Sequence, residues 1–388
     1  MAQYRIPFNR PTRTSQDQAY IQQALEAAHF SGDGPFTKRC HQMLEQTHGG
    51  AKALLTTSCT HAIEMAAFLL DIRPGDEVIV PSFTFVSSVN PFVIRGARPI
   101  FADVHPETLG IDERQVAALI TPRTRAIVVV HYAGIGCQMD VICALAAKHG
   151  ITVIEDNAHG FFGKFRGQLL GTFGQTSALS FHETKNFTCG EGGALLINDS
   201  SLVERAEIIR EKGTDRSKFH RGEIDKYGWV DQGSSYLPSE LLAAMLCAQL
   251  EDRQHIQSRR HELWRRYNAE LPAWAATHGV AMPVVPADRE HSAHMFYIVL
   301  PSVAFRDGLI ARLKSHGILA VSHYIPLNIS KMGRRFGGTD GGCPVAETLA
   351  ERLLRLPFYT QMTDAEQAEV ISLVTGYSPT GGQRPDRL

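Results

Sequence analysis

The sequence predicts an α/β protein in which a large, mostly parallel sheet domain precedes a small α+β domain. Short apolar runs alternate with helix-periodic segments through the first part of the chain, and this alternation indicates parallel strands covered by helices. From Pro272 the pattern changes to a few short strands and helices, which suits a small α+β unit. The 388 residues, 44% of them hydrophobic, are sufficient for both domains. We expect the large domain over residues 1–250, the small domain over 251–377 and a flexible tail over 378–388.

The order of elements follows from the period of the apolar residues, which is 2 in a strand and 3.6 in a helix. Prolines extend the first residues, and the chain then alternates between strands and helices up to a glycine-rich loop. We expect helices at 16–28, 37–48, 62–70, 112–120 and 140–148, strands at 51–57, 77–81, 99–104, 125–132, 151–156 and 177–181, and a further apolar run at 194–197.

The remaining segments contain more helix. An amphipathic helix at 199–212 leads into a polar loop at 213–236. This loop is too long for an ordinary connection, so we expect it to have a functional or intersubunit role. Further helices are expected at 239–250, 252–270, 305–316 and 363–376, and strands at 294–300 and 318–324.

Charge and composition limit the classes of function. The 39 basic and 40 acidic residues give a net charge of −1 and a pI near 7.0. This balance argues against nucleic acid or an anionic membrane as the main partner. No apolar run reaches transmembrane length, and the first 13 residues contain no apolar signal core. We therefore expect a cytoplasmic protein with no membrane contact.

Cysteine and histidine spacing gives no support for a metal site. The seven cysteines are scattered and include no Cys-x-x-Cys pair, whereas zinc and disulfide frameworks show tighter spacing. The 17 histidines include no His-Glu-x-x-His pattern. We therefore expect reduced thiols and no catalytic metal.

One stretch, residues 177–193, has the composition of a reactive site. A strand-like run ends near Ser180, a polar turn then presents Lys185, and a loop with three glycines follows. A lysine at the carboxyl end of a strand, beside glycines that let a ligand approach the backbone, is placed as a reactive group. A surface lysine in a loop would give the same pattern, so the upstream sequence decides between the two interpretations.

The upstream sequence supplies a second reactive group. Residues 151–156 begin as a β-branched run and end in Glu155 and Asp156. The carboxyl ends of buried parallel strands are where open α/β sheets keep their sites. Pyridoxal phosphate needs both a lysine, with which its aldehyde condenses, and a carboxylate partner for its ring nitrogen. Asp156 and Lys185 together therefore predict this cofactor.

Two further segments fit a flat, phosphorylated ligand. The run from Ser58 to Thr60 stands between a strand and an apolar helix, and the free amides of a helix N-terminus bind phosphate. Phe85 follows another strand, where an aromatic side chain could stack on a ring. Helix capping alone would also explain Ser58, and a phenylalanine in such a place is more often part of the core. The cofactor interpretation therefore depends on Asp156 and Lys185.

Four motifs follow one another along the chain: Ser58-Cys59-Thr60, Phe85, Asp156-Asn157-Ala158-His159 and Ser180-Phe181-His182-Glu183-Thr184-Lys185. In this order they resemble the DegT-type sugar-nucleotide aminotransferases, which are pyridoxal-phosphate enzymes with the aspartate aminotransferase fold, fold type I. The resemblance covers nearly the whole chain, from Ile6 to about Tyr377. Single motifs would be weak, but their order and spacing together are specific.

The resemblance implies catalytic roles for three residues. Lys185 would hold the cofactor through its aldehyde and then move a proton between the substrate carbon and the cofactor. Asp156 would pair with the ring nitrogen, and His159 would lie beside the phenolic oxygen of the ring.

The resemblance also implies binding roles. Phe85 would stack on the ring, and His323 and Tyr324 belong to a segment that resembles the one closing over the sugar in the family. The phosphate would be held around the helix start and the end of the neighbouring strand, by Ser58, Cys59, Thr60 and Ser180.

Two positions depart from the family pattern. Many relatives have an asparagine two residues after a glycine in the loop that reaches the phosphate of the partner subunit, whereas this chain has Ser235 after Gly233. The shorter hydroxyl makes that contact weaker or water-mediated. Asn157 is larger and more polar than the alanine or cysteine usual there, which changes the surroundings of the ring but not the chemistry. The resemblance further implies a homodimer whose sites are completed across the interface.

The implied reaction is amino transfer in two half-reactions. L-Glutamate would give its amino group to the cofactor, which would pass it to the C4 ketone of a nucleotide-linked sugar, a dTDP-4-keto-6-deoxyhexose. Ping-pong kinetics follow because both substrates use one site. Two alternatives are a sugar dehydratase that uses the same cofactor and a non-catalytic regulatory protein that has kept the fold. The presence of Lys185 disfavours both, because relatives of these kinds have lost the lysine.

Overall fold

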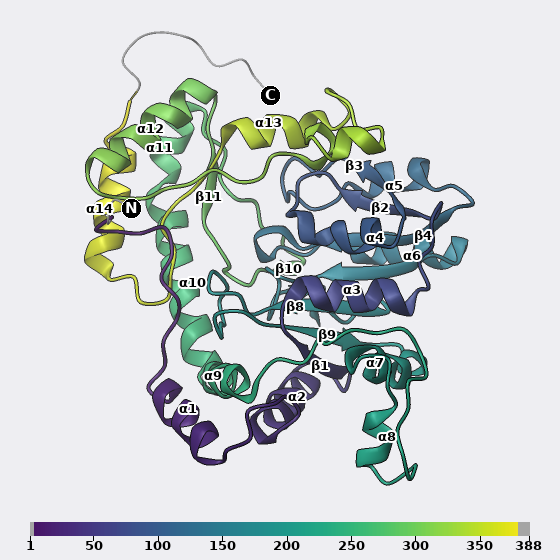
Figure 1. Cartoon of the computed structure of the whole chain (residues 1–388). Coiled ribbons are helices and arrows are strands. Elements are labelled where there is room, and N and C mark those ends of the chain that lie inside the picture. The colour runs from purple at the N-terminus through teal and green to yellow at the C-terminus, as the bar shows by residue number, and fades with distance from the viewer. Residues whose placement is uncertain (1–3, 379–388) are drawn as a thin grey trace.

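A seven-stranded sheet lies at the centre of the protein, in the order β1-β9-β8-β5-β4-β2-β3 (Figure 1). The computed structural model describes residues 4–378, so the predicted tail lies outside the described residues except for Ser378. Within this sheet β9 alone runs opposite to the other six strands, and the prediction of a mostly parallel sheet is confirmed. Its strands are β1 (Lys52–Thr56), β2 (Glu77–Pro81), β3 (Arg98–Ala102), β4 (Thr124–Val130), β5 (Thr152–Asp156), β8 (Thr176–Ser180) and β9 (Gly193–Ile197).

Helices cover both faces of this sheet because its strands are apolar on both sides. One face packs against α3 (Cys59–Leu69), α4 (Asn90–Ile94) and α7 (Val203–Arg210). The opposite face packs against α2 (Pro35–Thr47), α5 (Glu113–Leu119), α6 (Met139–His149) and α9 (Glu240–Glu251), with α1 (Asp17–Glu26) beside α9.

Alternation along the strands determines which side chains reach the start of α3. Ile154 of β5 and Ala178 of β8 pack in the core under α3, whereas Val153 packs in the core on the opposite face. Successive side chains of a strand point to opposite faces, so Asp156 and Ser180 lie on the α3 side. Both residues stand at the carboxyl ends of their strands. The sheet therefore delivers a carboxylate and a hydroxyl toward the N-terminus of α3.

The second core is formed by the C-terminal part of the chain together with the N-terminal segment. Ile6 is fully buried in this core and forms a bridge with Ile318. A two-stranded sheet, β11 (Tyr297–Val299) with β12 (Leu353–Arg355), lies beside the helices. The helices are α10 (Arg253–Glu270), α11 (Pro272–His278), α12 (Val303–Ser315), α13 (Pro344–Arg352) and α14 (Asp364–Thr375).

Two predicted strands of this region are shorter in the structure. Of residues 294–300 only Tyr297–Val299 are paired, because His294 and Met295 turn to line a cavity. Residues 318–324 form no strand but only single bridges, at Ile318 and Val321. His323 and Tyr324 leave the sheet direction and line the same cavity.

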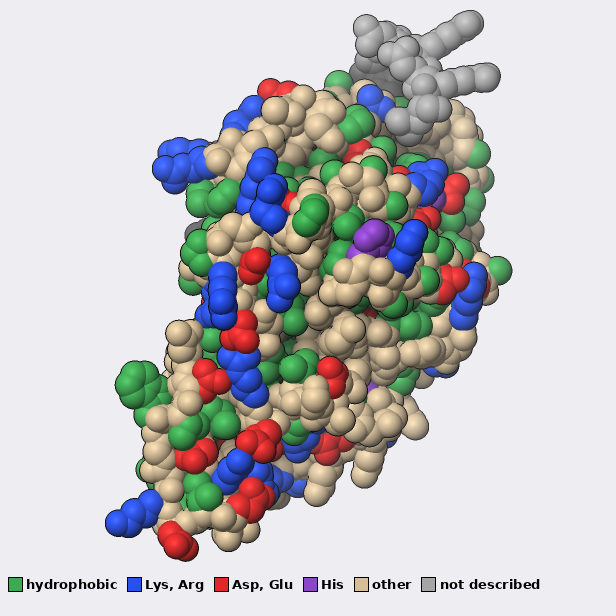
Figure 2. All heavy atoms as spheres, turned by 90° about the vertical axis from the view of Figure 1, so that its right-hand side faces the viewer, with side chains coloured by type: hydrophobic (Ala, Val, Ile, Leu, Met, Phe, Trp, Pro, Cys, Tyr) green, Lys and Arg blue, Asp and Glu red, His purple; other side chains and the backbone are tan. Residues whose placement is uncertain are grey.

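The long polar segment at 213–236 contains a short helix, α8 (Arg216–His220), which projects from the body of the protein (Figure 1). A small sheet, β10-β6-β7, joins Arg289–Glu290 with Lys164–Phe165 and Gln168–Leu169. On the face seen in Figure 2, side chains of both charges are interspersed. Within residues 4–378, none of the helices is both long and apolar enough to cross a membrane.

Candidate active site

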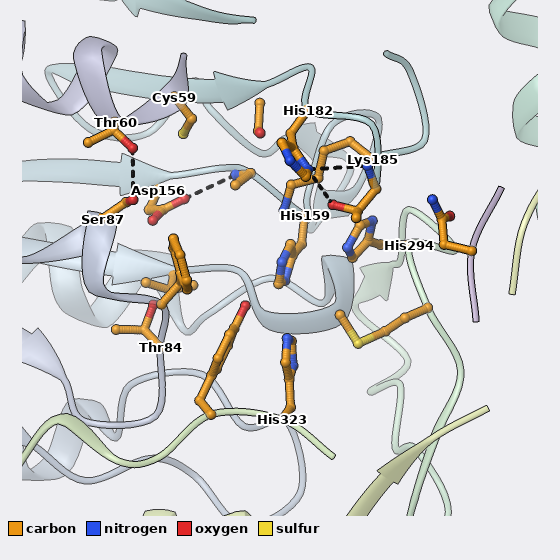
Figure 3. A pocket seen from close by; sticks show the side chains of 18 of the residues that line it. Cys59, Thr60, Thr84, Ser87, Asp156, His159, His182, Lys185, His294 and His323 are labelled. Carbon is orange, nitrogen blue, oxygen red and sulfur yellow. Dashed lines mark hydrogen bonds between the residues drawn. The ribbon is translucent and has the colours of Figure 1, made fainter. Parts of the chain in front are cut away.

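A cavity of about 720 Å³ opens at the carboxyl ends of the parallel strands, between the large sheet and the C-terminal core (Figure 3). Its walls come from the start of α3, the loop after β2, the ends of β5 and β8, and the C-terminal region. Ligands of open α/β sheets bind at this edge. The residues predicted from the sequence that line it are Ser58, Cys59, Thr60, Phe85, Asp156, His159, Ser180, Lys185, His323 and Tyr324.

Lys185 supplies an amine to this cavity from the loop after β8. Its backbone N–H donates to the carbonyl of His182 at 2.9 Å, and the N–H of Glu183 donates to the carbonyl of Gly190 at 2.9 Å, so the loop folds back on itself. The pKa of Lys185 is lowered to about 8, mainly by burial and to a lesser extent by the charge of Arg355, while Cys59 and Asp156 act in the opposite direction. The amine is therefore more often neutral, and more nucleophilic, than an ordinary lysine at neutral pH.

This pKa gives a testable pH dependence. In the cofactor-free protein, we expect the labelling rate of Lys185 by an amine-reactive acetylating reagent to rise about tenfold per pH unit up to about pH 8 and then level off. Ordinary exposed lysines continue to gain reactivity to near pH 10.4. Peptide mass spectrometry after competitive labelling would measure both rates, with the exposed Lys148 as reference. Parallel pH profiles for the two lysines would contradict the expectation.

Asp156 is fixed in the cavity as a hydrogen-bond acceptor. Its Oδ2 accepts from the hydroxyl of Ser88 at 2.6 Å, and its Oδ1 accepts from the N–H of Ala158 at 3.2 Å. Ser88 is itself linked to the hydroxyl of Thr84 at 2.7 Å. The carboxylate is buried, and these bonds hold it in one orientation. A cationic N–H donor placed in the cavity would find a fixed carboxylate.

The start of α3 offers free amides to the same cavity. The Ser58 hydroxyl accepts from the N–H of His61 at 3.1 Å, which caps the helix. The N–H groups of Cys59 and Thr60 find no acceptor among residues 4–378. Gly193 lets β9 approach this turn, because a Cβ at Gly193 would lie 2.3 Å from the carbonyl carbon of Ser58. Unpaired amides at a helix N-terminus form an anion site.

Three histidines form one wall of the cavity. The rings of His159 and His294 stack with centroids 4.2 Å apart, and the ring of His323 lies 6.3 Å from that of His159. The Nδ1 of His323 hydrogen-bonds the hydroxyl of Tyr132 at 2.7 Å, and that of His294 lies 3.0 Å from Oδ1 of Asn186. Burial lowers the pKa of all three, and the charge of Lys185 lowers it further, so the imidazoles are neutral.

One atom in this wall has no partner. The Nδ1 of His159 is buried without a hydrogen bond within the described part of the chain. Buried polar atoms are almost always paired, so this position points to a ligand that supplies the missing group. His323 stacks on Tyr324, with centroids 3.5 Å apart, and both side chains close the cavity opposite the start of α3.

Ser235 is not brought to this cavity within the chain. It lines a separate hollow with residues of the 213–236 segment and of the turn before α2, and it bridges Glu211. The prediction that Ser235 serves the phosphate of a partner subunit stays a prediction.

Sequence reasoning missed several residues that line or support the cavity. Ser88 and Asn186 hold Asp156 and His294, but short polar residues in loops give no distinctive signal. Arg355 lines the cavity from β12. The sequence does mark Arg355, because it is the one charged residue in the apolar run Leu353-Leu354-Arg355-Leu356-Pro357-Phe358.

Comparison with known proteins supports this geometry. A model of the DegT/DnrJ/EryC1/StrS aminotransferase family matches residues 11–375. The chain belongs to this family. The spore coat polysaccharide biosynthesis protein SpsC of Bacillus subtilis (strain 168) is 31% identical to the chain over 377 residues, which cover 95% of this chain and 96% of SpsC.

Solved structures agree with the family assignment. DesV of S. venezuelae, solved in complex with a ketimine intermediate, is 29% identical, with a TM-score of 0.85 over 94% of this chain and 95% of that chain. The PLP form of Spr1654 from Streptococcus pneumoniae shares the fold, with a TM-score of 0.87 and 24% identity over 96% and 98% of the two chains. The predicted fold class, that of the pyridoxal-phosphate aminotransferases, is confirmed.

Pyridoxal phosphate, the cofactor of this DegT family aminotransferase, fits the residues of the cavity. Lys185 is a partly neutral amine for the aldehyde, and Asp156 is a fixed acceptor for the ring N–H. The free amides at the start of α3 suit the phosphate. The unpaired Nδ1 of His159 suits the phenolic oxygen. These groups stand on separate elements around one space, as a single ligand with several polar ends requires (Figure 3).

Proposed function

We propose that the protein transfers an amino group from L-glutamate to the C4 ketone of a nucleotide-linked sugar, a dTDP-4-keto-6-deoxyhexose. One observation carries the proposal: Lys185, Asp156 and the unpaired N–H groups at the start of α3 all face one cavity. The sugar assignment is supported by the phrase Ser180–Asn186 and the run His294–Ile298, which resemble those of dTDP-4-amino-4,6-dideoxygalactose transaminase. The family description favours amino transfer, and the name of SpsC favours a sugar that is built into a polysaccharide.

We assign the chemical steps of this reaction to two residues of the chain and the bound cofactor. When bound, pyridoxal phosphate supplies an aldehyde that condenses with amines and a ring that accepts the electron pair of the neighbouring C–H bond. Asp156 would hold a proton on the ring nitrogen, because its carboxylate is oriented by Ser88 and by the N–H of Ala158. Lys185, with a pKa of about 8, would move a proton from the substrate carbon of the donor to the cofactor, and in the second half-reaction from the cofactor to the sugar carbon.

The other residues of the cavity bind and orient the cofactor and the sugar. The amides of Cys59 and Thr60 and the hydroxyl of Ser180 hold the phosphate, and Phe85 covers the ring from the rim of the cavity, where 56% of its surface is exposed. His323 and Tyr324 face the sugar from the opposite wall. Their stacked arrangement and the bond from Tyr132 fix the position of the His323 ring.

A homodimer in the cytoplasm is part of this proposal. Phe85 and Ile325 expose 56% and 74% of their surface at and near the rim of the cavity, and Ser235 lies in a hollow away from it. A second copy of the chain would cover these apolar residues and bring a Ser235 to each phosphate. The domain division at about residue 250 belongs to the same proposal, with the N-terminal segment packed against the small domain.

A spectrum of the purified protein tests the chemistry. We expect the protein loaded with pyridoxal phosphate to absorb in the visible, and L-glutamate to remove this absorbance while 2-oxoglutarate is formed. D-Glutamate, which presents its C–H bond differently, is the control and should leave the spectrum unchanged. A dTDP-4-keto-6-deoxyhexose should restore the absorbance, and NMR of the product would locate the new amine. Visible absorbance that persists with L-glutamate would favour the dehydratase or the regulatory protein.

A further inference from the structure

The proton of the His294 ring is placed by the neighbouring Asn186. The Nδ2 of Asn186 donates to the carbonyl of Ser292 at 2.9 Å, so the atom that lies 3.0 Å from Nδ1 of His294 is the amide oxygen of Asn186. An amide oxygen only accepts, so Nδ1 of His294 carries a proton and donates it. Burial lowers the pKa of His294, and the charge of Lys185 lowers it further, so the ring is neutral and holds no second proton. Its Nε2 is therefore an acceptor and cannot donate.

This acceptor belongs to a ring that lines the cavity, and it is unused. Within residues 4–378, Nε2 of His294 makes no hydrogen bond, although the amine of Lys185 opens on the same cavity. Two contacts hold the ring in place. It stacks on His159 with centroids 4.2 Å apart, and the carbonyl of His294 accepts from the fully buried guanidinium of Arg260. A fixed acceptor without a partner indicates a ligand that brings an O–H or N–H group.

The donor and acceptor groups of the proposed ligands select the one that fits this acceptor. Pyridoxal phosphate has an N–H donor on its ring nitrogen, for which Asp156 is the fixed acceptor. Both carboxylates of L-glutamate only accept, and its amine condenses with the cofactor. A sugar offers hydroxyl groups, each of which can donate. The bare Nε2 of His294 therefore suits the sugar and not the amino donor.

The position of His294 narrows the choice to one hydroxyl. Lys185 must reach the sugar carbon that receives the amine, and the ring of His294 is close enough to feel the charge of Lys185 (Figure 3). In a 4-keto-6-deoxyhexose, the neighbours of C4 are C3, which carries a hydroxyl, and C5, which carries the ring oxygen and a methyl group. We propose that Nε2 of His294 accepts a hydrogen bond from the C3 hydroxyl of the ketosugar, with Asn186 as the positioning residue that keeps Nε2 free of a proton. This inference rests on the proposed function.

Two substitutions of His294 test the geometry of this contact. Glutamine places an amide oxygen near the position of Nε2, whereas asparagine reaches only as far as Nδ1. We expect His294→Asn to lower kcat/KM for the ketosugar about tenfold more than kcat/KM for L-glutamate, as for the loss of one hydrogen bond. His294→Gln should recover most of this difference. His149→Asn, at an exposed histidine, is the matched control.

Nuclear magnetic resonance tests the role of Asn186. In protein labelled with heavy nitrogen in its histidines, the signals that disappear in His294→Gln belong to His294. We expect them to show a protonated Nδ1 and a bare Nε2. Asn186→Ala should shift them toward the other tautomer, which loss of packing alone would not do. A bare Nδ1 in the wild type would overturn the inference, whatever the variants do.

A binding measurement separates the inference from the proposed function. dTDP-6-deoxyglucose has no ketone and binds without reacting, and its analogue without the C3 hydroxyl of the sugar lacks only the group in question. Calorimetry with the loaded wild type should show about tenfold weaker binding of the analogue, and His294→Asn should bind the two sugars about equally. Equal binding by the wild type, or an unchanged preference in a folded His294→Asn, would overturn the inference. A wild type that binds neither sugar and does not react with the ketosugar would overturn the proposed function as well.

Discussion

Lys185→Ala is expected to abolish amino transfer and leave the protein folded. The side chain is the only lysine that lines the cavity within the described residues, and we propose two roles for its amine, holding the cofactor and moving the proton. We expect turnover to fall by at least about 10⁴-fold, the upper range for loss of a positioned acid–base group. An assay of multiple turnovers with L-glutamate and a ketosugar would measure this fall, with Lys148→Ala, at an exposed lysine, as the control.

The same variant should not lose stability. Burial is the main reason that the pKa of Lys185 is about 8 in the folded protein instead of 10.5, so below pH 8 both states hold the proton and the folded state holds it at a cost. The wild type without cofactor therefore bears a cost that disappears as the pH rises from 8 toward 10.5 and is absent in Lys185→Ala. After allowance for screening by water in the cavity, this cost is up to about 2 kcal/mol. Urea unfolding at pH 7 and pH 10 would measure the difference.

Two outcomes would contradict this assignment. Appreciable multiple turnover by a folded Lys185→Ala protein would show that another group moves the proton. A variant that is unfolded at neutral pH would show that the lysine is structural. Added small amines offer a further check, because a free amine that enters the cavity should restore part of the proton transfer in Lys185→Ala.

The sequence allowed the sheet side of the site to be predicted because that side is encoded locally. Asp156 and Ser180 each end a strand, and the period of two places both side chains on the face of α3. The helix start at Ser58 follows another strand of the same sheet. Parallel strands bring their carboxyl ends to one edge, so the pattern of elements was sufficient to bring these residues together.

The opposite wall could not be predicted in the same way. His294 and Arg355 come from segments that pair only briefly, and their positions depend on how the C-terminal core packs against the sheet. Residues 318–324 have the composition of a strand, but the chain turns there to place His323 and Tyr324 in the cavity. The direction of β9 is likewise a matter of tertiary pairing, because its apolar run fits either direction.

Glu155, next to Asp156, supports the site from the other face of the sheet. It is fully buried, and its Oε1 accepts from the N–H groups of Phe173 and Gly174, both at 2.8 Å. Its Oε2 accepts from the N–H of Gly171 at 2.7 Å and lies 2.9 Å from Nε2 of His131. Burial opposes the charge, but the bonds from His131 and the amides lower the pKa of Glu155. The Nδ1 of His131 accepts from the N–H of Cys137 at 3.2 Å, so its proton is on Nε2, which donates to Glu155.

Glu155→Gln is expected to destabilise the protein strongly. The amide of glutamine would direct N–H groups at donors that now meet a carboxylate oxygen. A hydrogen bond to a charged group contributes about 1.5–3 kcal/mol, and four donors meet at Glu155. Urea unfolding at pH 7 would measure this loss, with the exposed Glu351→Gln as the matched control. Because Glu155 also holds the loop before β8, we expect weaker retention of pyridoxal phosphate during dialysis.

A double-mutant cycle separates the bond between Glu155 and His131 from the bonds to the backbone amides. If the pair carries the effect, His131→Gln should cost nearly as much as Glu155→Gln, and the double variant should cost much less than the sum of the two. If the loss of stability comes from the bonds to the loop amides, the two losses should add, and His131→Gln alone should lower the free energy of unfolding only slightly. Equal stability of Glu155→Gln and Glu351→Gln would contradict both explanations. In that case Asp156 would owe its position to Ser88 and the N–H of Ala158 alone.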